Sequence, residues 1–107
     1  MKITAIKYFE AFEKRDISAI RDILDNNVKL RDWEINASGI DSVLAETARI
    51  FCSAEAISIK IINIFQHHTF VVAELDITIN NINSIYVVDI IEFNSIGKIS
   101  AIRAFKG

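Results

Sequence analysis

An aspartate interrupts one of the most apolar stretches of the chain, SIYVVDIIEF at residues 84–93. Side chains alternate between the two faces of a strand, so Asp89 shares its face with Ile85, Val87, Ile91 and Phe93. A carboxylate on a half-buried strand destabilises the fold unless it is paired, hydrogen-bonded or kept neutral. Asp89 is therefore the first candidate for a chemical role.

Two further polar side chains share faces with apolar neighbours. Asp32 ends the alternating run VKLRD and points the way Val28 and Leu30 point. Tyr8 precedes Phe12 by one turn on the packed side of an expected helix, so its hydroxyl can reach inward. If helices cover the sheet, these two side chains and Asp89 meet in one interior.

Two carboxyls and a phenol in an apolar interior suit proton transfer next to a carbonyl. Desolvation raises carboxyl pKa values, and neighbouring carboxyls push their pKa values apart, so one can act as a base while the other stays neutral. The neutral acid and the phenol can then donate hydrogen bonds to a developing enolate oxygen. A structural interpretation stays open, since a buried phenol often only packs and an aspartate often binds nearby backbone N–H groups.

The elements that must position these residues follow from hydrophobic periodicity, which changes at about residue 56. Before it, helical spacing predicts three helices and one strand; after it, runs rich in β-branched residues predict four strands. We expect helices over 3–14, 17–24 with Asp16 as N-cap, and 40–51, and strands over 28–32, 56–66, 69–79, 84–93 and 98–105. This order indicates an α+β fold in which helices cover one concave face of a sheet.

Length and composition limit the classes of function. The 107 residues suffice for one domain, and a net charge of −2 with scattered basic residues gives no sign of nucleic-acid binding. A single cysteine, Cys52, excludes an intramolecular disulfide and favours a reducing compartment. The N-terminus lacks the apolar core of a signal peptide, and no apolar run is long enough to span a membrane. We expect a cytoplasmic protein that does not bind membranes.

Three segments carry a family resemblance that covers nearly the whole chain. They are YFEAFEKRDISAIRDILDNNVKLRD near the start, Gly39 before the third helix, and VVDIIEFNSIGKISAIRAFKG at the end. With them the chain resembles the NTF2-like superfamily, in the branch of SnoaL-like proteins and ketosteroid isomerases. The resemblance implies one domain over 1–107: a cone in which three helices of the N-terminal half wrap a strongly bent antiparallel sheet around an apolar pocket. It also implies a homodimer through the outer face of the sheet.

The resemblance also implies roles for the three polar residues. Ketosteroid isomerases use a tyrosine on the first helix and aspartates on the first strand and a late strand, which match Tyr8, Asp32 and Asp89. Asp32 would move the proton, while Tyr8 and protonated Asp89 would form the oxyanion hole, without a cofactor. The residues expected to line the pocket are Phe12, Leu30, Trp33, Val87, Ile91 and Phe105. Trp33 is a departure, because family enzymes tend to have proline after the base.

Three functions are compatible with this pattern. The first is an isomerase or related lyase acting on a small hydrophobic ketone. The second is another cavity enzyme, such as a SnoaL-type cyclase with an aspartate acid or base. The third is a non-catalytic ligand-binding or dimerisation module.

The remaining polar residues favour simpler roles. His67 and His68 are adjacent at a turn and lack a convergent third ligand, so we expect no metal site. Cys52 is expected to close a helix face beside Phe51 and to be buried as a small hydrophobic side chain. Glu74 is expected on the outer sheet face with Asp76, and Arg103 is expected to pair with a carboxylate that the sequence does not identify.

Overall fold

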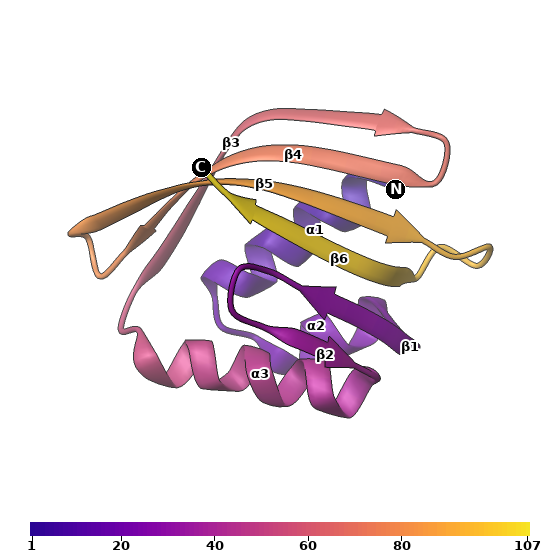
Figure 1. Cartoon of the computed structure of the whole chain (residues 1–107), viewed down its shortest axis with the longest axis horizontal. Helices are drawn as coiled ribbons and strands as arrows, with labels where there is room; N and C mark the ends of the chain where they lie inside the picture. The colour runs from indigo at the N-terminus through magenta and orange to yellow at the C-terminus, as the bar shows by residue number, and fades with distance from the viewer.

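The computed structural model describes all residues, 1–107, and contains three helices and six strands (Figure 1). In chain order they are α1 Lys2–Glu13, α2 Ile17–Ile23, β1 Leu24–Arg31, β2 Asn36–Ser38, α3 Ile40–Ser53, β3 Ile57–His67, β4 Phe70–Ile79, β5 Asn83–Phe93 and β6 Ile99–Lys106. The α+β fold class is confirmed. The short strand β2 was not predicted.

The strands form one curved, open sheet in the order β2-β1-β6-β5-β4-β3. Strands β3 to β6 form the expected antiparallel meander, with β4 and β5 paired without interruption from Phe70↔Glu92 to Ile79↔Asn83. Strand β1 lies beside β6 and parallel to it, so the sheet is mixed and not wholly antiparallel. Helix α1 crosses behind β5 and β6, and α3 lies along the β1–β2 side (Figure 1).

Local signals fix where α2 and α3 begin. The Asp16 carboxylate accepts a hydrogen bond from the Ala19 N–H at 3.1 Å, which confirms the expected N-cap. Gly39 precedes α3 with φ of 89°, a backbone conformation that side chains other than glycine rarely adopt. Its N–H donates to the Val28 carbonyl at 2.8 Å, so the start of α3 is fastened to β1.

A bulge in β6 corrects one pocket prediction. The pairs Glu92↔Ala101 and Phe93↔Ile99 leave Ser100 as an extra residue, which reverses the alternation beyond it. Phe105 is therefore not a pocket residue: it lies on the outer face and is 56% exposed. The same reversal puts Arg103 outside, where it pairs with Glu92 at 3.6 Å.

The structure also shows how Cys52 is exposed and how long and apolar the helices are. Cys52 is exposed, contrary to its expected burial, because it lies near the end of α3 on the side away from the core. None of the helices is long and apolar enough to cross a bilayer.

Candidate active site

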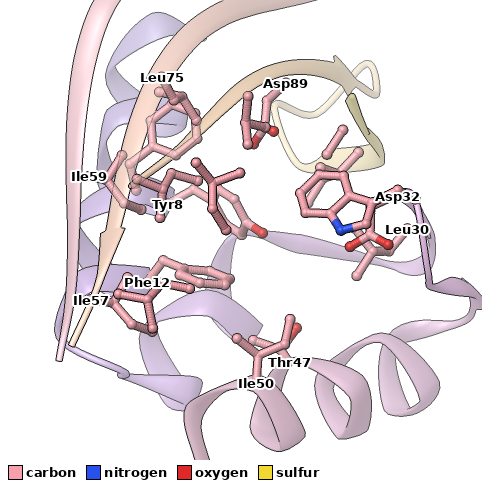
Figure 2. Close-up of a pocket in the computed structure, with 18 residues that line it drawn as sticks. Tyr8, Phe12, Leu30, Asp32, Thr47, Ile50, Ile57, Ile59, Leu75 and Asp89 are labelled. Carbon is pink, nitrogen blue, oxygen red and sulfur yellow. The ribbon is translucent and has the colours of Figure 1, made fainter. Parts of the chain in front are cut away.

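Tyr8 reaches the interior from α1. Its side chain is 6% exposed and packs edge-on against the Phe9 ring at 5.7 Å between centroids, with the Phe12 ring tilted against it at 5.9 Å. Figure 2 shows its hydroxyl directed into an open space that Asp89 and Asp32 also border. The helix thus delivers a phenolic O–H to the centre of an apolar environment.

Asp89 enters the same space from the inner face of β5. Its partners on the neighbouring strands are Ala73 and Ala104, whose small side chains leave room for a carboxylate between them. Asp89 is 8% exposed, and burial raises its pKa to about 7, with a smaller contribution from the charge of Asp32. Near neutral pH this carboxyl therefore holds its proton about half of the time.

Asp32 follows β1 directly and organises the turn into β2. Its Oδ1 accepts hydrogen bonds from the N–H groups of Glu34 at 2.7 Å and Ile35 at 2.6 Å, and its own N–H donates to the Ile35 carbonyl at 2.9 Å. Asp32 therefore binds nearby backbone N–H groups, which is the structural alternative to a catalytic role that the sequence left open. Its second oxygen, Oδ2, accepts no hydrogen bond within the chain, and the residue borders the cavity.

The oxygens of Tyr8 and Asp89 are open to the cavity. Neither side chain forms a hydrogen bond within the chain, yet the structure contains no sealed side-chain N or O atom without a partner. These oxygens must therefore face accessible space. Burial raises the pKa of Tyr8 above its ordinary value, and the nearby charges of Asp89 and Asp32 raise it further, so its hydroxyl remains a donor.

The cavity itself is small and apolar, with a volume of about 130 Å³ and 15 hydrophobic residues among the 18 that line it. Four of the expected lining residues border it, namely Phe12, Leu30, Trp33 and Val87. Ile91 does not, because it is wholly buried in the core, and Phe105 is on the other face. The expected set was therefore wrong at these two positions.

Four of the lining residues missed by sequence reasoning are isoleucines of β3 and β4. Ile57, Ile59, Ile77 and Ile79 alternate along the inner faces of these strands, a signal that indicates burial but not which cavity is bordered. Thr47 of α3 was also missed as a lining residue. Its hydroxyl donates to the Val43 carbonyl at 2.8 Å and is therefore already satisfied.

The sequence matches the SnoaL-like domain family over residues 5–102. The chain belongs to this family. No curated protein sequence matches it.

Solved structures place this SnoaL-like chain among proteins of varied activity. A candidate ketosteroid isomerase from Kribbella flavida DSM 17836 superposes with a TM-score of 0.82 at 14% identity, covering 98% of this chain and 76% of that one. A candidate polyketide cyclase from Sinorhizobium meliloti gives 0.85 at 11% identity, covering 94% and 92%. An epoxide hydrolase from M. tuberculosis gives 0.81 at 15% identity, covering 97% and 80%. At such identities the similarity establishes the fold alone.

Other polar groups of the SnoaL-like chain lie away from this cavity. The rings of His67 and His68 meet edge-on at 4.1 Å between centroids, and His68 has φ of 52°, so the two side chains do not diverge as a continued strand would require. No group of three or more His, Cys, Asp or Glu residues is placed to hold a metal ion. On the outer sheet face, Glu74 accepts hydrogen bonds from Tyr86 and Asn63.

Proposed function

We propose that this protein is a cofactor-independent enzyme that moves a proton next to the carbonyl of a small hydrophobic ketone, as a ketosteroid isomerase does. One observation carries the proposal. A phenol and a carboxyl that is about half protonated near neutral pH, neither with a partner in the chain, open into an apolar cavity that a second carboxylate borders. Such unpaired donors stabilise an oxygen that becomes negative during reaction.

Asp32 is the proposed base. The two N–H bonds to Oδ1 fix the orientation of its carboxylate, and Oδ2 remains free for a substrate proton. A group held in place before the substrate arrives avoids the entropy loss of being positioned during the reaction.

Tyr8 and protonated Asp89 are the proposed oxyanion donors. The raised pKa of Tyr8 keeps the phenol protonated, and the pKa of about 7 at Asp89 keeps this carboxyl at least half neutral up to that pH. Water-excluding walls strengthen both hydrogen bonds because the surrounding side chains are mostly hydrophobic.

The test is Asp32→Asn with a cyclic β,γ-unsaturated ketone as substrate. The amide oxygen can still accept from the Glu34 and Ile35 N–H groups, so the turn should persist while the base is lost. We expect kcat/KM to fall about 10³-fold with an unchanged circular dichroism spectrum. A fall of less than tenfold would remove Asp32 from the role of base.

Asp25→Asn is the matched control. Asp25 lies on β1, the strand that Asp32 follows, and its carboxylate also accepts a nearby N–H, that of Asn27 at 3.1 Å, but it does not border the cavity. Its turnover should equal that of the wild-type protein. An equal loss in both variants would indicate a general structural effect.

A SnoaL-type cyclase is the second candidate, supported by the similarity to the candidate polyketide cyclase. Polycyclic esters tested beside the unsaturated ketones would separate the two, and the cavity of about 130 Å³ favours the smaller substrates. A non-catalytic module would be favoured by a filled interior. The open oxygens of Tyr8 and Asp89 argue against it.

We also propose that the outer face of the sheet binds a second copy of this chain. Phe65, Tyr86 and Phe105 are 61%, 48% and 56% exposed there, with half-buried Val72 and Ile90 between them. The face also carries both charge signs, as the Arg103–Glu92 pair shows, so a two-fold copy can meet it without net repulsion.

The dimer is tested by light scattering after size exclusion. We expect a dimer for the wild-type chain and a folded monomer for Phe105→Asp, because the new charge would be buried at the interface. Ile96→Asp, a change at an exposed residue of the β5–β6 turn, is the control and should remain dimeric. A monomeric wild-type chain would overturn this proposal.

A further inference from the structure

Trp33 forms the outer wall of the cavity. It borders the cavity and is nevertheless 45% exposed, so one side of the indole faces the interior and the other faces solvent. Every other lining residue is buried or half-buried. Trp33 is therefore the lining side chain that most separates the cavity from water.

The position of Trp33 is set from both sides. It lies in the turn that Asp32 holds through hydrogen bonds to Glu34 and Ile35, so its backbone is fixed. On the ring, the Lys106 ammonium lies 6.0 Å from the centroid, a distance at which a cation is attracted to an indole face. The turn at its backbone and the Lys106 ammonium at its ring therefore both restrain Trp33 in the cavity wall.

The volume of the cavity is that of one small ring. About 130 Å³ lies well below the roughly 300 Å³ at which pockets for drug-sized ligands begin. It is close to the roughly 150 Å³ of an engineered apolar cavity in another protein that admits benzene. A fused second ring would have to project out of this volume or displace a wall residue.

We infer that Trp33 determines the size of the ligand, closing the cavity over a single-ring ketone or phenol and excluding fused-ring ligands. This inference rests on the proposed function for the chemistry of the ligand, a carbonyl-derived oxygen directed at Tyr8 and Asp89. It adds a residue that selects among such ligands without taking part in proton transfer. Trp33 does so because its indole occupies the space that a second ring would need.

Phenols provide the test, because their planar ring and oxygen mimic an enolised ring ketone and their binding needs no turnover. Calorimetric titration with phenol and 2-naphthol would be compared for wild type, Trp33→Ala and Trp33→Phe. We expect wild type to bind phenol at least about tenfold more tightly than 2-naphthol. In Trp33→Ala the preference should reverse, and Trp33→Phe should lie between. Ile96→Ala, which shortens an exposed apolar side chain in a distant turn, should behave as wild type.

The inference fails if wild type binds the two phenols equally or if both Trp33 variants keep its preference. Should Trp33→Ala not fold, Trp33→Phe decides, since it keeps an aromatic ring in the wall. Trp33 is the single tryptophan, so quenching of wild-type fluorescence by phenol gives a second readout. Size selection combined with full turnover of Asp32→Asn would refute the proposed function alone. Loss of size selection with an inactive Asp32→Asn would refute this inference alone.

Discussion

A tyrosine and a carboxyl occur on each face of the sheet, and their hydrogen bonding and pKa shifts differ between the two faces. On the outer face, Tyr86 donates to Glu74, and this bond, with a second from Asn63, lowers the pKa of the glutamate. On the inner face, Tyr8 and Asp89 have no partner in the chain, and burial raises the pKa of both. Two buried polar side chains that lack a partner beside a cavity keep their hydrogen-bonding capacity for a ligand.

The largest expected contrast is between the two tyrosines. Tyr8→Phe should lower kcat/KM on a cyclic β,γ-unsaturated ketone by about 10²- to 10³-fold, because one oxyanion donor is lost. Its free energy of unfolding should stay unchanged or rise, since the missing hydroxyl had no partner. Tyr86→Phe should leave turnover unchanged, because its hydroxyl bonds Glu74 on the other face. Equal losses of kcat/KM in Tyr8→Phe and Tyr86→Phe would show that the unpaired hydroxyl on the inner face has no special role in turnover.

The carboxylates give the next contrast, in stability against pH. Asp89 has an ordinary pKa in the unfolded chain and a pKa of about 7 in the folded one, so the folded state binds the extra proton. Ionising Asp89 therefore destabilises the fold progressively as pH rises from about 4 to 7, and the loss is complete above 7. The neutral variant Asp89→Asn should be more stable than wild type by about 2 to 4 kcal/mol at pH 8. Near pH 4 the two should agree.

Urea unfolding at a series of pH values would measure this difference. Glu74→Gln is the matched control on the outer face, where the lowered pKa gives the opposite sign: the wild-type carboxylate stabilises the fold above its ordinary pKa, and the variant loses this. If Asp89→Asn gave no gain at pH 8, the inner carboxylate would be solvated or paired after all. Such a gain in a less active variant would be a trade of stability for function.

The sequence predicts which face of the sheet a side chain occupies only where the strand pairs without a bulge. The pairing of β4 with β5 is uninterrupted, so simple alternation placed Asp89 inside and Glu74 outside. In β6 the extra residue Ser100 reverses the alternation, and the same reasoning failed for Phe105. A bulge depends on how two strands register in the folded sheet, and no residue type in KISAIRAF signals it.

The candidate site was predicted in its polar residues and not in its walls. An unpaired charge among aliphatic residues is visible in one strand, as Asp89 shows, because the conflict is local. The volume of the cavity arises from packing between α1, α3 and the strands β1, β3, β4, β5 and β6, which are spread over the whole sequence. The turn at Asp32 was foreseen only as one of two roles, whereas the structure assigns backbone contacts to Oδ1 and leaves Oδ2 free.

The smallest expected effect lies in the outer ion pair. Arg103 and Glu92 approach to 3.6 Å with side chains 39% and 38% exposed, so solvent screens their attraction. Glu92→Gln keeps the shape of the side chain and should change the free energy of unfolding by less than about 0.5 kcal/mol, and by less still in 1 M salt. Urea titrations at low and high salt measure this, with Glu46→Gln in the exposed Arg49–Glu46 pair of α3 as reference. A salt-sensitive loss of more than about 1 kcal/mol in the free energy of unfolding would contradict this prediction. It would mean that the charged pairs on the outer face stabilise the fold.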